Sequence, residues 1–147
     1  MKPAELLFDT SVYVSYRNAA ESLQAGWFSA VVWQELAAGA NGRSELQRLA
    51  ATGAWYHKRG RLLVPEKDAW WQAGQILNHL LSDLSRAHKG RTRPQLAQPK
   101  KQSIIRDVLI AVSAKQQGVT VISDNEDFPL IRHYYEFRWR AAADFFA

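Results

Sequence analysis

Short runs of apolar residues alternate along the chain with longer stretches in which apolar positions recur every three to four residues. The runs at 6–8, 61–64 and 119–122 predict buried strands, and 136–139 predicts a last edge strand. A further apolar run occupies 27–32. Helical spacing predicts helices at 10–20, 34–38, 44–56, 66–84, 104–117 and 123–134. Apolar strands that alternate with helices are typical of a parallel sheet covered on both faces, so the predicted fold class is α/β.

The helix predicted at 66–84 is strongly amphipathic. Its apolar face is predicted to contain Trp70, Ala73, Leu77, Leu80, Leu81 and Leu84. Trp70 is therefore expected in the core, and Trp71 either on the surface or at a dimer interface. For Trp27, Trp33 and Trp55, the core or an interface is favoured over a role in stacking on bases.

Length and composition limit the classes of protein that the chain can represent. Its 147 residues suit one domain, and 47% of them are hydrophobic, which allows a packed core. No apolar run approaches the roughly 20 residues that cross a bilayer, and the first residues do not form a signal peptide. We therefore expect a cytoplasmic protein. The absence of cysteine excludes disulfides and thiolate chemistry.

Positive charge is concentrated in one part of the sequence. The formal net charge is +5, and no acid occurs between Asp83 and Asp107. This stretch also contains Pro94 and Pro99, so an irregular loop is predicted at about 86–103. It is either an RNA-binding loop or a solvated linker. The residues expected to bind RNA phosphates are Arg86, Lys89, Arg91, Arg93, Lys100 and Lys101.

Acidic residues follow two of the predicted strands. Asp9 comes directly after 6–8, and Asp124 comes soon after 119–122. Ligands of parallel sheets bind at the carboxyl ends of the strands, so both acids stand where a site is expected. Asp107 lies in a helix that is apolar nearly all round, and burying a carboxylate there is costly unless it is paired or binds a metal.

Each acid also has a structural interpretation. Asp9 could cap the following helix, Asp107 could pair with Arg106, and Glu35 could be a solvated side chain. In the last acidic cluster (Asp124, Glu126 and Asp127), Ser123 and Glu126 fit a capping box. Capping does not exclude metal binding at the same position.

A set of carboxylates suits the hydrolysis of phosphodiesters. One or two divalent ions can stabilise the attacking and leaving oxygens and make a bound water more acidic. Mg²⁺ prefers oxygen ligands and keeps several waters, so a few carboxylates are sufficient. No spacing typical of a zinc site is found among the histidines, His57, His79, His88 and His133.

Four segments in this order resemble the PIN-domain family, and most closely the VapC toxins of bacterial toxin–antitoxin pairs. They are LLFDTS at 6–11, SAVVWQEL at 29–36 followed by Gly39, Asp107 in its apolar helix, and VISDNEDF at 121–128. The resemblance extends from about residue 5 to residue 140. It implies a single PIN-like domain over 1–147, an α/β/α sandwich with a central parallel sheet, and a metal-dependent endoribonuclease.

Carried over by position, the resemblance assigns the site residues. Asp9, Glu35 and Asp107 match the first three acids of the family, with Thr10 and Ser11 as the polar residues beside Asp9. The fourth acid of the family falls on Asn125, preceded by Ser123, so Asp124 or Asp127 is expected to replace it. The expected ligands of Mg²⁺ or Mn²⁺ are Asp9, Asp107, Glu35 and Asp124, and Asp127 completes the catalytic set.

The resemblance also implies partners. These are an RNA substrate (transfer, ribosomal or messenger RNA), a VapB-like antitoxin that inserts a segment into the active-site groove, and a second copy of the chain in a homodimer. Because Asn125 departs from the family pattern, a catalytically degenerate module that binds RNA or a protein remains an alternative. A phosphatase with Asp9 as nucleophile is another, although Ser11 stands where such enzymes usually have a second acid.

Overall fold

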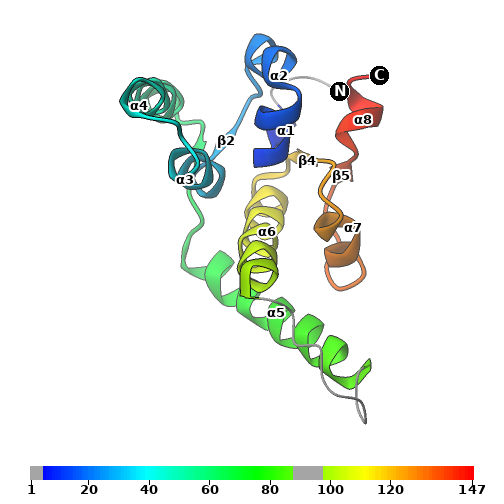
Figure 1. The fold of residues 1–147 in the computed structure, drawn as a ribbon. Coiled ribbons are helices and arrows are strands. Elements are labelled where there is room, and N and C mark those ends of the chain that lie inside the picture. The colour runs from blue at the N-terminus through cyan, green and yellow to red at the C-terminus, as the bar shows by residue number, and fades with distance from the viewer. Residues whose placement is uncertain (1–4, 88–97) are drawn as a thin grey trace.

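Short parallel strands form the centre of the fold. The computed structural model describes residues 5–87 and 98–147 (Figure 1). Its strands are β1 (Leu6–Phe8), β2 (Phe28–Ser29), β3 (Leu62–Leu63), β4 (Thr120–Ile122) and β5 (Trp139–Arg140). The pairings β1–β4, β4–β5 and β2–β3 are all parallel, and a bridge between Leu7 and Trp27 connects the two sets. The predicted parallel sheet is confirmed.

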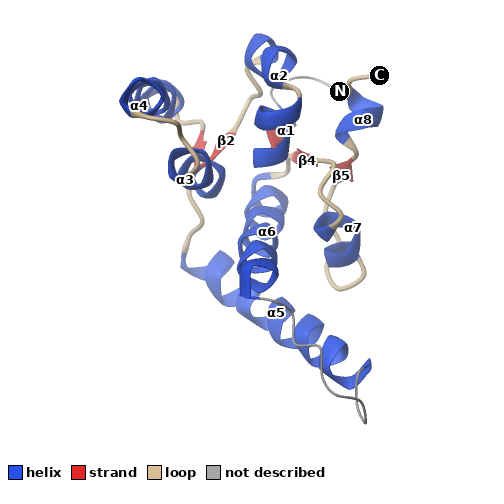
Figure 2. Cartoon of the chain, in the orientation of Figure 1, coloured by secondary structure: helices blue, strands red, loops and turns tan. Residues whose placement is uncertain are grey.

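Helices cover the sheet on both faces (Figure 2). They are α1 (Thr10–Ser15), α2 (Arg17–Leu23), α3 (Ala30–Ala38), α4 (Arg43–Lys58), α5 (Lys67–Ala87), α6 (Gln98–Gln117), α7 (Asp127–Arg132) and α8 (Ala142–Phe145). No helix within the described ranges is both long and apolar enough to cross a bilayer.

Alternate residues of β1 face two different cores. Leu7 belongs to a large core built with α3, α5, α6 and α7, whereas Leu6 and Phe8 belong to a smaller one with α1, α2 and α8. This alternation follows from the two-residue repeat of a strand. Figure 1 shows α1, α2 and α8 on one side of the strands and α5, α6 and α7 on the other. The expected α/β/α sandwich is thereby confirmed.

Several predicted boundaries were wrong, among them the last strand, which was predicted at 136–139 and is Trp139–Arg140. The predicted helix 10–20 breaks at Tyr16, whose backbone leaves the helical region (φ −125°, ψ 33°). The apolar run at 27–32 forms only two residues of strand, since the Ser29 hydroxyl accepts from the N–H groups of Val31 and Val32 and starts α3. The helix predicted at 123–134 begins only at Asp127.

The predicted irregular loop at 86–103 is shorter than expected. Helix α5 continues to Ala87 and α6 already begins at Gln98, so Arg86, Lys100 and Lys101 are helical. Proline is tolerated in a first helical turn because its missing N–H would have no partner there, and Pro99 stands in that turn. Lys89, Arg91 and Arg93 lie outside the described residues.

The prediction that Trp70 lies in the core was also wrong. Its side chain is 59% exposed, and Trp71 beside it is 72% exposed. The fully covered stripe of α5 is instead Ala69, Ala73, Ile76 and Leu80. This stripe contains Ala69 in place of the predicted Trp70, so Trp70 lies outside the buried face of α5.

Trp33 holds α3 against α4. Its indole N–H donates to the carbonyl oxygen of Leu49 over 2.8 Å, and its ring lies directly over Gly53. A Cβ added at Gly53 would come within 2.3 Å of the Trp33 ring, so only glycine permits this close approach. The expected core position of Trp33 agrees with this packing.

Replacing Gly53 by alanine should therefore destabilise the fold although alanine favours helices. We expect the free energy of unfolding to fall by about 1–3 kcal/mol through overpacking. The matched control is Gly74→Ala on α5, where nothing lies within 4 Å of the added Cβ. That change should raise the free energy of unfolding by up to about 1 kcal/mol. Urea unfolding measures both, and equal effects would contradict the proposed contact.

Candidate active site

Four carboxylates converge beyond the carboxyl ends of β1 and β4. Asp9 follows β1, Asp127 begins α7 after β4, Glu35 lies on α3, and Asp107 lies on α6. The charges of Asp9, Asp127 and Glu35 all act on Asp107, so the four groups form one electrostatic cluster. The structure thus brings together four of the five predicted catalytic acids.

Asp9 is held by two hydroxyl groups. Its carboxylate is buried, with 3% of the residue exposed. Ser123 Oγ and Ser11 Oγ both donate to Asp9 Oδ2, over 2.8 and 3.0 Å. The parallel register pairs Phe8 with Ile122 and so sets Asp9 and Ser123 side by side. Asp9 occupies the N-cap position of α1 but makes no side-chain capping bond, so capping does not account for its burial.

Asp107 lies in an environment that strongly disfavours a negative charge. It is 3% exposed, and Asn125 Nδ2 donates to its Oδ2 over 3.1 Å. Burial, followed by the nearby charge of Asp9 and by the hydrogen bond and charge of Asp127, raises the pKa of Asp107 far above its usual range. The alternative ion pair with Arg106 is not formed within the described residues, because Arg106 turns to Glu35 instead.

Glu35 is half-buried and has a cationic neighbour. Thr10 Oγ1 donates to Glu35 Oε1 over 3.2 Å. Arg106 Nε lies 3.2 Å from Glu35 Oε2, as an ion pair whose angles are not those of a hydrogen bond. Burial raises the pKa of Glu35, the charge of Arg106 opposes this, and the charge of Asp9 adds to it. Glu35 is thus part of the cluster and not a solvated side chain.

Asp127 has the other cationic neighbour of the cluster. It is 2% exposed, it forms an ion pair with Lys100, and Ser103 Oγ donates to it over 3.3 Å. Its backbone N–H donates to Asn125 Oδ1 over 3.0 Å. Asn125 therefore connects Asp107 and Asp127 through its two amide atoms.

The predicted capping box of Ser123 and Glu126 is not formed. Ser123 Oγ accepts from the backbone N–H of Asn125 over 2.9 Å and donates to Asp9. Glu126 is exposed and provides no side-chain cap for α7. Ser123 and Asn125 thus connect the predicted acids to one another.

Asp124 lies apart from the other four acids. It is exposed, and its two oxygens accept from Tyr16 Oη over 2.7 Å and from the backbone N–H of Ala143 over 2.9 Å. These two donors, Ala143 first, lower the pKa of Asp124. The residue that stands beside Asp107 is Asp127, so the expectation that Asp124 joins the cluster was wrong.

Sequence reasoning missed Ser103, although a signal was present. Ser103 precedes Asp107 by one helical turn, which places both on the same face of α6. Lys100 was expected at RNA, and its contact with Asp127 depends on α6 starting earlier than predicted.

The acids fit a divalent ion only if water completes its coordination. Among residues 5–87 and 98–147, no three histidine or acidic side chains are arranged to hold one ion. Mg²⁺ is usually bound by one or two carboxylates, with waters in the remaining positions. Asp9 and Asp107 are a buried carboxylate pair of this kind, and neither has a cationic partner within the described part of the chain.

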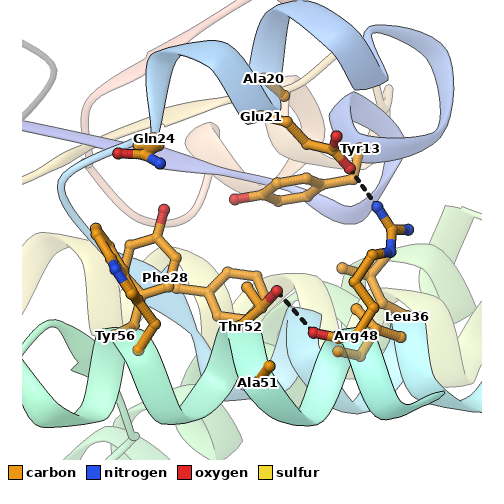
Figure 3. A pocket seen from close by; sticks show the side chains of 12 residues that line it. Tyr13, Ala20, Glu21, Gln24, Phe28, Leu36, Arg48, Ala51, Thr52 and Tyr56 are labelled. Atoms are coloured by element: carbon orange, nitrogen blue, oxygen red, sulfur yellow. Dashed lines mark hydrogen bonds and ion pairs between the residues drawn. The ribbon is translucent and has the colours of Figure 1, made fainter. Parts of the chain in front are cut away.

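A hollow lies between α2 and α4 (Figure 3). Its volume is about 420 Å³, and its walls include Tyr13, Phe28, Tyr56 and Leu36. Arg48 Nη1 and Glu21 Oε1 form an ion pair of 2.8 Å across the rim. Leu36 follows Glu35 on α3, and Tyr13 lies one turn after Thr10 on α1, so the hollow and the acid cluster share these two helices.

Known structures show the same fold. A chain from the structure of FitAB bound to an IR36 DNA fragment has 17% identity and a TM-score of 0.53, with 93% of this chain and 94% of that chain covered. A chain from DNA-bound VapBC of Salmonella typhimurium has 18% identity and a TM-score of 0.51, with 94% and 98% covered. No curated protein sequence matches the chain.

A family model matches most of the sequence. The model described as the PIN domain covers residues 6–134, which include Asp9, Glu35, Asp107 and Asp127. The chain therefore belongs to the PIN domain family.

Proposed function

We propose that the protein is a metal-dependent endoribonuclease of the VapC toxin type. The observation that carries this proposal is the buried pair Asp9 and Asp107. Within the described residues, Glu35 and Asp127 each have a cationic partner, whereas these two carboxylates have none. An uncompensated pair of buried carboxylates is costly to the fold unless a cation binds it.

Mg²⁺ or Mn²⁺ would be held by Asp9 and Asp107. When bound, the ion would stabilise charge on the phosphate oxygens and make a water more acidic. Ser11 and Ser123 orient Asp9 for this role, and Asn125 orients Asp107. Glu35 and Asp127 border the same space and would accept hydrogen bonds from ordered waters.

Two cations at the cluster would contact the RNA backbone. Arg106 forms an ion pair with Glu35, and Lys100 forms one with Asp127. A phosphate that enters the site would therefore lie close to two positive charges. Arg86, Lys89, Arg91, Arg93 and Lys101 are proposed to extend this phosphate contact. Arg86 forms an ion pair with Asp83 and would have to exchange that partner.

Asp107→Asn should abolish cleavage of RNA. We expect the rate to fall by about 100-fold or more, as when charge stabilisation of a transition state is lost. The matched control is Asp124→Asn, which should retain the wild-type rate because Asp124 contacts Tyr16 and Ala143 instead. Cleavage of a labelled pool of transfer and ribosomal RNA, with Mg²⁺, Mn²⁺ or EDTA, measures both variants. Full activity of Asp107→Asn, or activity in EDTA, would contradict the proposal.

The melting temperatures of the wild type and Asp107→Asn, measured with and without Mn²⁺, test the alternative of a degenerate binding module. The observation that favours this alternative is Asn125, which stands where the family usually has an acid. A binding module has no need of a divalent ion, so its melting temperature should not respond to Mn²⁺. If the nuclease proposal holds, Mn²⁺ stabilises the wild type and has little effect on Asp107→Asn.

We further propose that a small VapB-like antitoxin occupies the hollow between α2 and α4. Its aromatic walls suit an apolar side chain, and its position beside Glu35 would let a bound segment continue into the acid cluster. Such a segment would block RNA at the site without any change in the catalytic residues.

Filling this hollow should weaken the antitoxin and leave catalysis intact. Ala51 lines the hollow, and Ala54 on the same helix does not. We expect Ala51→Trp to reduce the affinity for the proposed VapB-like antitoxin by at least about tenfold, the equivalent of one lost apolar contact. Ala54→Trp is the matched control. Calorimetry measures the affinity, and equal binding by both variants would place the antitoxin elsewhere.

The homodimer expected from the family resemblance is also a proposal. Trp70 and Trp71 in the first turns of α5 are 59% and 72% exposed, and Val64, three residues before this helix, is 57% exposed. Aromatic residues are enriched in the centres of interfaces, and two adjacent exposed tryptophans suit such a surface.

Replacing both tryptophans by glutamate should dissociate the proposed dimer. Charge in the centre of an interface is unfavourable, so we expect Trp70→Glu/Trp71→Glu to sediment as a monomer at concentrations where the wild type is dimeric. Val14→Glu is the control, because Val14 is 72% exposed on α1. A wild type that sediments as a monomer would refute the dimer, and a dimeric double variant would exclude this face.

A further inference from the structure

A basic hollow lies at the end of the sheet opposite the acids. It has a volume of about 670 Å³ and is bounded by the beginnings of β4 and β5 and by the end of α7. Trp139 and Phe137 form part of its surface. The charged residues that line it are Lys115, Arg132, Glu136, Arg138 and Arg140.

The four cations of this hollow are exposed and are not neutralised. Within residues 5–87 and 98–147, none of Lys115, Arg132, Arg138 and Arg140 has an ion-pair partner. Lys115 Nζ donates to the backbone carbonyl of Glu136 over 2.6 Å and lies 5.1 Å from the Tyr135 ring centre. With one glutamate against four cations, the hollow attracts anions.

Three elements connect the hollow with the acid cluster. On α6, Lys115 follows Asp107 by eight residues, or about 12 Å at 1.5 Å per residue. On α7, Arg132 follows Asp127 by five residues, or about 8 Å. Along β4, Thr120 precedes Ser123 by three residues, or about 10 Å. An oligonucleotide of several residues can therefore reach both places.

We propose that this hollow binds backbone phosphates of the RNA several nucleotides away from the bond that is cut. The inference rests on the proposed ribonuclease function and deepens it, because it favours a substrate longer than the acid cluster alone requires. Exposed cations spread over one concave surface suit a chain of phosphates better than a single small anion. Trp139 is partly buried against the core, and the part of its ring that lines the hollow adds a planar surface on which a base can stack.

The test compares two triple variants that remove the same charge. Both are made in the Asp107→Asn background, which keeps the RNA intact. Arg132→Gln/Arg138→Gln/Arg140→Gln changes the hollow, and Arg43→Gln/Lys58→Gln/Lys67→Gln changes exposed cations on α4 and α5. Fluorescence anisotropy with a labelled 30-nucleotide RNA gives Kd over a range of salt concentrations. Circular dichroism confirms that both variants fold.

We expect the hollow variant to bind this RNA about tenfold more weakly and the slope of log K against log salt to fall by about two, at about 0.7 per lost phosphate contact. The other triple variant should change neither the affinity nor the slope by a comparable amount. With Asp107 restored, cleavage of a tetranucleotide should be unaffected by the hollow variant, whereas cleavage of the long RNA should slow.

Other results would overturn the proposal in distinguishable ways. If both triple variants bind the long RNA equally, the hollow is not an RNA contact, although Asp107-dependent cleavage would still support the nuclease. If the hollow variant loses binding of a labelled polyglutamate peptide but not of RNA, the hollow serves an acidic protein partner. A wild type that neither binds nor cleaves RNA would overturn both the hollow and the proposed function.

Discussion

The parallel pairing of β1 with β4 is the constraint on which the candidate site depends. Its register sets Phe8 beside Ile122, and the next residues, Asp9 and Ser123, become neighbours at the strand ends. A shift of β4 by one residue relative to β1 would turn its side chains to the opposite face and separate Ser123 from Asp9. The buried apolar residues of the strands, which fill two different cores, therefore also determine the position of the first acid.

In the cluster of four carboxylates, the stability of the fold and the binding of a cation favour different protonation states of Asp107. Burial and like charge disfavour the ionised form of Asp107, yet ligation of a cation needs that form. The fold reduces the conflict with short polar side chains: two serine hydroxyls at Asp9 and one amide at Asp107. These groups orient the carboxylates without adding the counter-charge that would compete with an ion.

The sequence allowed the fold class and most of the acid positions to be predicted, because both follow from local patterns. Asp9 is identified by the apolar strand that precedes it, and Asp107 by the apolar residues 104–112 around it, in which Arg106 is the one other charged residue. The choice between Asp124 and Asp127 could not be made in this way, since it depends on where α7 starts and on how α8 meets Asp124. Trp70 was misplaced for a similar reason: its exposure depends on which face of α5 packs into the large core, and that face contains Ala69 and Ala73.

The packing of α8 connects the C-terminal residues to strand β1. Phe145 and Phe146 lie against Phe8, the residue before Asp9, and Phe146 stacks on Tyr16 at 4.8 Å. Helix α8 is only four residues long and has little stability of its own. Its transient detachment would break the hydrogen bonds from the N–H groups of Ala142 and Ala143 to Ser123 and Asp124, so amide exchange at these two residues would report local opening of the last helix and not only global unfolding.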